Sequence, residues 1–264
     1  MPGAVVVIPT YNEKETITAI VDRILAADSE VHILVVDDNS PDGTGQIVDG
    51  IAASNPRVNV MHRTEKNGLG TAYVNGFGWA LEQGYDYIIE MDADGSHQPE
   101  ELSRLLKLLD GGANLAIGAR WIPGGKTENW PWYRQLISRS GTTYARMMLS
   151  SKLHDITSGY RGFSADTLRA LDLSKLDSAG YCFQIELAWL VERSGGRARV
   201  SHHVRRAARG PLENDHGHRG RGALQGHLVG HRLPPRPHPQ VAALGEPREL
   251  NFLVRRRGDK LRIS

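Results

Sequence analysis

Two aspartates separated by one residue, Asp92 and Asp94, follow an expected strand that is rich in isoleucine and methionine and ends at Met91. Side chains at positions i and i+2 of a strand point to the same face, so both carboxylates can approach one ion. Oxygen ligands of this kind suit Mg²⁺ or Mn²⁺, which commonly hold a phosphate-bearing substrate through one or two carboxylates. The alternative is a strand-ending turn whose acids cap a helix that begins near Pro99. The spacing alone leaves both interpretations open.

A second pair of acids, Asp37 and Asp38, ends a strand expected to be the neighbour of the first and leads into a Ser-Pro-Asp-Gly-Thr turn. Carboxylates there could accept hydrogen bonds from ribose hydroxyls or from the edge of a base, as an acidic residue does at a strand end in dinucleotide-binding folds. The alternative is an Asx turn with helix capping by Ser40 and Asp42. Both can hold together, with the first acid binding a ligand and the later residues forming the turn.

The segment 130–149 places a cation and a hydroxyl, Arg134 and Ser138, one helical turn apart, and such a pair could bind a phosphate. It also mixes aromatic and basic residues in a way that suits a membrane interface: Trp130, Trp132, Tyr133, Arg139 and Arg146. The alternative, which periodicity alone favours, is an ordinary amphipathic helix packed on a sheet.

Short β-branched runs alternate with longer segments of helical period over the first 200 residues, which predicts an α/β domain with a largely parallel sheet. The expected strands cover residues 4–8, 32–37, 58–62, 87–91 and 115–118, and the expected helices cover roughly 13–26, 44–53, 69–83, 99–109 and 133–149. Ligands bind at the carboxyl ends of strands in such sheets. The acids and Arg120, which all follow strands, are therefore expected at one edge.

The net charge of +2 conceals a difference between the two ends of the chain of 264 residues. Residues 1–200 carry 19 Lys and Arg against 25 Asp and Glu, whereas residues 201–264 carry 13 against 5 and hold no Trp or Tyr. The second composition cannot bury much apolar area, so we expect a catalytic domain at 1–200 and a poorly ordered Arg-, Pro- and His-rich tail at 201–264. The basic tail also raises a nucleic-acid-binding protein as an alternative class, although the acidic first 200 residues argue against it.

A single cysteine, Cys182, excludes an intrachain disulfide and a zinc site built from cysteine pairs. The longest apolar runs are far shorter than the roughly 20 residues that cross a bilayer, and the first residues lack the pattern of a secretory signal. We therefore expect a cytoplasmic protein.

Five motifs occur in order: Pro-Thr-Tyr-Asn-Glu at 9–13, Val-Asp-Asp-Asn-Ser-Pro-Asp-Gly-Thr at 36–44, Gly-Leu-Gly-Thr-Ala-Tyr at 68–73, Met-Asp-Ala-Asp at 91–94 and Thr-Ser-Gly-Tyr-Arg-Gly-Phe at 157–163. Together they resemble the dolichol-phosphate mannosyltransferases, and more closely the actinobacterial polyprenol monophosphomannose synthases. The resemblance covers about residues 4–199 and implies a family 2 inverting glycosyltransferase with a GT-A fold. It implies transfer of mannose from GDP-mannose to a polyprenyl phosphate. The nearest alternative is the same fold with another donor, such as UDP-glucose.

The resemblance also implies roles for the matching positions. Donor-nucleotide contacts would come from Pro9, Tyr11, Glu13, Asp37, Asp38, Ala93 and Arg120, the last of which would touch the diphosphate or the acceptor. Asp92 and Asp94 would hold the diphosphate through Mg²⁺ or Mn²⁺ and are the expected catalytic residues, with Ser96 as a weak third metal ligand. Arg134 and Ser138 would receive the lipid phosphate.

A lipid acceptor implies peripheral contact with the cytoplasmic face of a membrane, with an anchor protein as a further partner and no nucleic acid. In the family, a strand continues past residue 200 into a Pro-Ile-Thr-Phe-type segment and then into basic residues that contact donor phosphates. This chain has Ser-His-His-Val at 201–204 and Arg-rich sequence instead. Back-translation read one base out of register restores family-like sequence, so our hypothesis is a frameshift close to codon 200.

Overall fold

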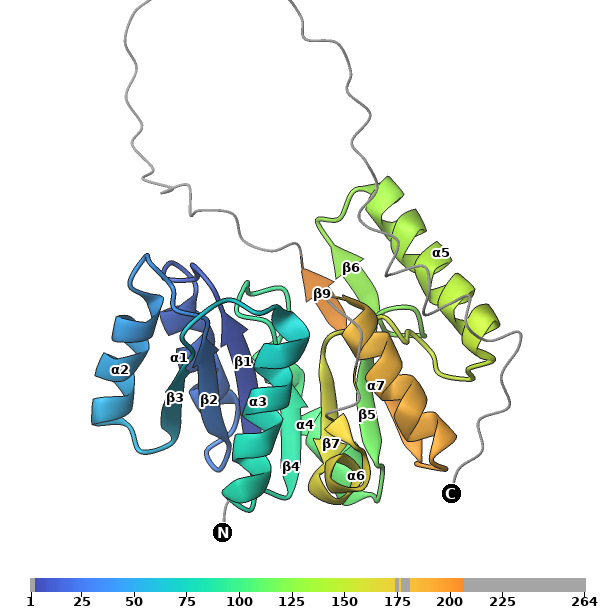
Figure 1. The fold of residues 1–264 in the computed structure, drawn as a ribbon. Helices are drawn as coiled ribbons and strands as arrows, with labels where there is room; N and C mark the ends of the chain where they lie inside the picture. The colour runs from blue at the N-terminus through green and yellow to red at the C-terminus, as the bar shows by residue number, and fades with distance from the viewer. Residues whose placement is uncertain (1–2, 174–175, 177–180, 207–264) are drawn as a thin grey trace, which may run out of the picture. The chain divides into compact units, whose positions relative to one another are not determined.

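The computed structural model describes residues 3–173, 176 and 181–206. Its main sheet contains β1 Ala4–Thr10, β2 His32–Asp37, β3 Val58–His62, β4 Tyr87–Glu90, β5 Leu115–Ala119, β7 Arg161–Ser164 and β8 Ala198–His202. The strand order is β3-β2-β1-β4-β7-β5-β8 (Figure 1), and every neighbouring pair is parallel except those that β7 makes with β4 and β5. The predicted α/β fold with a largely parallel sheet is confirmed.

Helices cover both faces of this sheet, because successive residues of a strand point to opposite sides. They are α1 Ile17–Ala27, α2 Thr44–Ser54, α3 Leu69–Glu82, α4 Leu102–Asp110, α5 Trp132–Leu149, α6 Ala165–Ala170 and α7 Tyr181–Arg193, with a 3₁₀ turn at Pro99–Glu101. In β1, Val5 and Val7 join the buried cluster of α3, α6 and α7, whereas Val6 and Ile8 join that of α1, α2 and α4. The sheet is therefore a middle layer between two apolar cores.

β1 lies between β2 and β4, so the two strands that end in acidic pairs are not neighbours, and that expectation was wrong. Pairing in register sets Thr10 of β1 beside Asp37 of β2, and Val7 of β1 beside Glu90 of β4. All three strands run parallel, so their carboxyl ends still share one edge of the sheet. The strand order places a β1 loop between the two acidic pairs.

β7 is a buried strand that the sequence analysis did not predict, because its surroundings read as polar and glycine-rich. Arg161 is fully buried, and its guanidinium donates to the backbone carbonyls of Ser158, Gln184 and Ile156. Glu90 pairs with Arg161 in register, and burial raises the pKa of Glu90 to about 8 although the charge of Arg161 opposes the shift. These hydrogen bonds allow a charged residue to lie inside the sheet.

The change of composition at residue 200 falls inside β8, which pairs with β5 as far as His202. A further strand, β9 Val204–Arg206, pairs in parallel with β6 Lys126–Glu128. Residues 201–206, which composition assigned to the tail, therefore all belong to strands except His203, because strand pairing depends on backbone hydrogen bonds and not on apolar content alone. The rest of the tail prediction concerns residues 207–264, which lie outside the described residues, and the frameshift stays a hypothesis.

Candidate active site

The acidic residues predicted to bind a ligand gather at the carboxyl edge of three adjacent strands (Figure 1). The ends of β1, β2 and β4, and the loops that leave them, carry Pro9, Tyr11, Glu13, Asp37, Asp38, Asp92, Ala93 and Asp94. This is the edge at which a parallel α/β sheet binds ligands. Arg120 follows β5, which β7 separates from β4.

The Asp92–Asp94 segment is held in a turn by short-range hydrogen bonds. Asp94 Oδ1 accepts from the backbone N–H of Ser96 at 2.9 Å, and Gly95 adopts a φ of +72°, which favours glycine. The backbone N–H of Asp92 donates to His97 Nδ1 at 3.0 Å, and the Tyr73 hydroxyl donates to Asp92 Oδ1 at 3.4 Å. The 3₁₀ turn at Pro99–Glu101 has no side-chain cap, so the two acids do not cap that helix.

The charges around this turn fit a divalent cation. Burial raises the pKa of Glu13, and the nearby carboxylates of Asp94 and Asp92 raise it further, so these acids repel one another across the same space. Among the described residues, no three His, Cys, Asp or Glu side chains converge as a complete ligand set. Two carboxylates that leave other positions to substrate oxygens and water are the usual way in which Mg²⁺ is held. The buried Ser96 Oγ has no hydrogen-bond partner within the described residues.

The Asp37–Asp38 pair has intramolecular partners, and the contacts between Asp37 and Ser40 confirm the predicted turn. The predicted capping by Ser40 was wrong, because the N-cap of α2 is Gly43, which has no side chain to cap this helix. Asp37 is 2% exposed, and its carboxylate accepts from the Thr10 hydroxyl at 3.0 Å, from the Ser40 hydroxyl at 2.6 Å and from the Ser40 backbone N–H at 3.1 Å. Asp38 forms an ion pair with Arg63 at 2.7 Å, and burial raises the pKa of Asp38 although Arg63 opposes the shift. Contact of either acid with a ligand stays a prediction.

Tyr11 offers an exposed ring at the end of β1. Its side chain belongs to the exposed class, and Lys66 Nζ lies 3.8 Å from the ring centroid. Asn12, the next residue, adopts a φ of +61° and its backbone N–H donates to Ser40 Oγ at 3.0 Å. The loop after β1 is thus tied to the loop after β2, and a planar group could stack on the ring.

Arg120 is buried and engaged in an ion pair that the sequence analysis missed. Its Nη2 lies 2.5 Å from Asp155 Oδ1, its Nε donates to Asp155 Oδ2 at 2.8 Å, and Nη2 also donates to Thr157 Oγ1 at 2.9 Å. Asp155 belongs to a loop 35 residues later, so no local signal could have identified the pair. These contacts hold the Arg120 guanidinium in one orientation.

Three guanidinium groups surround the ring of Trp130, and we call them the arginine cluster. Arg134 Cζ lies 4.1 Å from the ring centroid, and Arg120 and Arg205 each lie 5.8 Å from it. Arg205 also forms an ion pair with Asp92, at 3.3 Å between Nη2 and Oδ2. The arginine cluster is therefore continuous with the acidic turn. Sequence reasoning missed Arg205 because it lies 113 residues from its partner, in the segment assigned to the tail.

α5 presents an unusually apolar surface to solvent. Only Thr142, Ala145 and Leu149 of this helix are buried. Large exposed side chains cover much of the remainder: Trp132, Tyr133, Leu136, Ile137, Tyr144, Met147 and Met148. Arg134 is exposed and Ser138 is half-buried, one turn apart as predicted. No helix within the described residues is long and apolar enough to cross a membrane. The helix thus packs through one narrow stripe and leaves an aromatic and basic face open.

Known proteins resemble the chain over the part that carries this site. A family model described as Glycosyl transferase family 2 matches residues 5–171. The polyprenol monophosphomannose synthase of Mycolicibacterium smegmatis is 56% identical over 191 residues, 72% of this chain and 72% of that protein. The undecaprenyl-phosphate mannosyltransferase of Micrococcus luteus is 53% identical over 191 residues, 72% of this chain and 78% of that protein. The solved structure of a mannosyltransferase from Pyrobaculum calidifontis in complex with GDP-Man and Mn²⁺ shares the fold, with a TM-score of 0.55, 20% identity and coverage of 78% of this chain and 57% of that one.

Proposed function

Since the chain belongs to glycosyl transferase family 2 and has the GT-A fold, we propose that it transfers mannose from GDP-mannose to a polyprenyl phosphate with inversion, releasing GDP. The observation that carries the proposal is the junction between the acidic turn and the arginine cluster, through the Asp92–Arg205 ion pair. Carboxylates suited to a cation lie beside guanidinium groups suited to phosphates, as a reaction between two phosphate-bearing substrates requires.

The proposed reaction requires the protein mainly to position the two substrates and to stabilise the charge on the leaving group. An oxygen of the lipid phosphate attacks the anomeric carbon of mannose on the side opposite GDP, the bond from that carbon to the β-phosphate oxygen breaks, and GDP leaves with the electron pair. A phosphate monoester is already anionic at neutral pH, so no general base is needed. Holding the two substrates in line then supplies much of the rate enhancement.

Asp92 and Asp94 would hold Mg²⁺ or Mn²⁺, with Ser96 as a weak third ligand. When bound, the cation stabilises the negative charge that develops on the leaving diphosphate. The donor pocket would be lined by Pro9, Tyr11, Glu13, Asp37, Asp38 and Ala93, with the guanine ring near the exposed face of Tyr11. Asp37 already accepts hydrogen bonds from the Thr10 and Ser40 hydroxyls, so its role would be to fix the shape of this pocket.

The lipid phosphate would bind between Arg134 and Ser138. Arg134 stacks on Trp130, and within the described residues it makes no ion pair, so its charge is available to a phosphate. Arg120, whose guanidinium is already paired with Asp155, would add positive potential and not a mobile ligand. Contact with the cytoplasmic face of a membrane, through α5 and with or without an anchor protein, would bring the polyprenyl chain to this point.

The exposed apolar face of α5 predicts reversible binding to lipid bilayers. Ile137, which is 68% exposed, is changed to Asp, and we expect binding to vesicles of phosphatidylcholine with 30% phosphatidylglycerol to fall about 30-fold, because an apolar contact worth roughly 2 kcal/mol is lost and a negative charge is added. Co-sedimentation with the vesicles measures the bound fraction. Ser103→Asp, which adds the same charge to the exposed face of α4, is the control. Equal binding by the Ile137 variant and the wild type would contradict membrane contact through α5.

A competition between donors tests the transfer itself. The full chain is incubated with polyprenyl phosphate, Mn²⁺ and equal concentrations of GDP-mannose and UDP-glucose. The sugar is then released from the lipid fraction by mild acid and identified as mannose or glucose by chromatography against standards. We expect polyprenyl phosphate mannose to dominate. Lipid-linked glucose as the main product would favour the alternative donor, and the absence of both products would overturn the proposed function.

A further inference from the structure

His97 is a buried imidazole whose hydrogen bonding is directed at a proposed metal ligand. It is fully buried, and its Nδ1 accepts the backbone N–H of Asp92 at 3.0 Å. An Nδ1 that accepts carries no proton, so the ring proton of the neutral form is on Nε2. Nε2 lies 3.6 Å from Asp92 Oδ2 and has no hydrogen-bond partner within the described residues. Burial lowers the pKa of His97 well below its usual range, which keeps the ring neutral.

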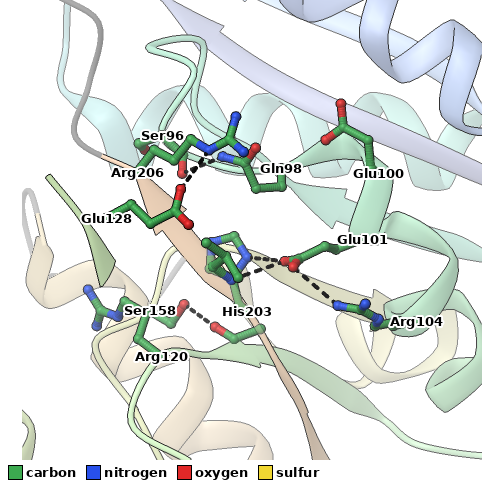
Figure 2. A network of polar contacts seen from close by, with 12 residues as sticks. Ser96, Gln98, Glu100, Glu101, Arg104, Arg120, Glu128, Ser158, His203 and Arg206 are labelled. Carbon is green, nitrogen blue, oxygen red and sulfur yellow. Dashed lines mark hydrogen bonds and ion pairs between the residues drawn. The ribbon is translucent and has the colours of Figure 1, made fainter. Parts of the chain in front are cut away.

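The ring of His97 packs against two rings from distant parts of the chain, those of Tyr160 and His203. It stacks on Tyr160, with centroids 5.2 Å apart and planes 15° apart, and meets the ring of His203 edge-on at 5.6 Å. His203 Nδ1 lies 2.6 Å from Glu101 Oε2, and Glu101 also pairs with Arg104 at 3.1 Å (Figure 2). The imidazole therefore cannot turn without displacing the rings of Tyr160 and His203.

We infer that His97 is a positioning residue that sets the place and direction of Asp92 for binding a divalent cation. Two contacts support this role: the hydrogen bond from the Asp92 backbone, and the Nε2–H group near the carboxylate of the same residue. Side chains that orient metal ligands in this way typically contribute 10- to 100-fold to metal affinity. The inference rests on the proposed function, because it takes Asp92 to be a metal ligand.

The experiment measures Mn²⁺ affinity and not transfer. Free Mn²⁺ is quantified by electron paramagnetic resonance as the full chain, with GDP present, is titrated. His97→Phe keeps a ring of similar shape against Tyr160 but removes the acceptor, whereas His97→Asn offers a carbonyl oxygen in its place. His62→Phe, at an exposed histidine paired with Asp49, is the matched control. Thermal unfolding of each variant reports stability separately.

We expect His97→Phe to weaken Mn²⁺ binding 10- to 100-fold, His97→Asn to recover most of that loss, and His62→Phe to bind like the wild type. If His97→Phe does not fold, a folded His97→Asn within about 3-fold of wild-type affinity supports the inference. Wild-type affinity in a folded His97→Phe, or a loss in folded His97→Asn as large as that in Asp92→Ala, would overturn it. If the Mn²⁺ affinities follow the expected pattern but the wild type transfers no mannose, the proposed function is rejected and the role of His97 stands.

Discussion

The Asp94→Ala variant is expected to lose mannose transfer by about 10³-fold or more while keeping its fold. Asp94 contributes one of the two carboxylates of the acidic turn, and stabilisation of a leaving diphosphate by a bound cation is worth several kcal/mol of activation free energy. Alanine also removes the acceptor for the Ser96 backbone N–H, which is the loss of one local hydrogen bond in a partly buried turn. Initial rates with GDP-mannose and polyprenyl phosphate at several Mn²⁺ concentrations measure the effect.

A control variant at an acid outside the site tests whether the loss of one negative charge is by itself enough to lower the rate. Asp22→Ala, at an exposed position of α1, removes the same charge and should leave the rate unchanged. Asp94→Asn tests whether the oxygen atoms or the negative charge matter, because the amide keeps the shape of the carboxylate and binds hard cations poorly. Near-normal transfer by Asp94→Ala at saturating Mn²⁺, with Asp22→Ala equally active, would refute the assignment of Asp94 to the metal site.

The Asp155→Asn variant is expected to be less stable than the wild type by about 3 to 5 kcal/mol, because it leaves the buried guanidinium of Arg120 without a counter-charge. Both side chains of the pair are almost completely buried. Asn is chosen because Asp155 adopts a φ of +55°, which Asn tolerates better than Ala does. Urea denaturation followed by circular dichroism gives the free energy of unfolding.

Removing both charges should cost less than removing one. The double variant Arg120→Met with Asp155→Asn is expected to recover much of the lost stability, since no unpaired charge stays in the interior. Asp166→Asn, which breaks the exposed pair between Asp166 and Arg169, should change stability little. Asp155→Asn as stable as Asp166→Asn, or a double variant less stable than Asp155→Asn, would contradict this account of the pair.

Most strands, and the sheet edge at which the acidic residues lie, could be predicted from local sequence. β2 and β3 were predicted with their observed bounds, and β1, β4 and β5 within two residues, because β-branched runs bounded by turn residues are a local signal. The residues that follow parallel strands must lie at one edge, so the acidic turn at Asp92 and the loop at Asp37 were also placed correctly.

The missed elements are those that depend on partners far away in the chain. β7 is buried because it pairs with β4 and β5, two strands that lie far earlier in the chain, and because Arg161 donates to the carbonyl of Gln184 in α7. Nothing within the segment itself indicates these partners. β8 and β9 were missed because composition after residue 200 indicates a solvated tail, whereas pairing with β5 and β6 uses backbone groups that every sequence carries.

The sequence by itself determined the α/β layers, the edge that carries the acids and the motifs of a family 2 glycosyltransferase, since each follows from residues close together in the chain. The tertiary structure alone decided how the charges are used. It brought Thr10 to Asp37, committed Arg120 to Asp155 and brought Arg205 to Asp92. These pairings join residues from separate strands and loops, and a buried charge takes whatever partner the packed chain brings within a few ångströms.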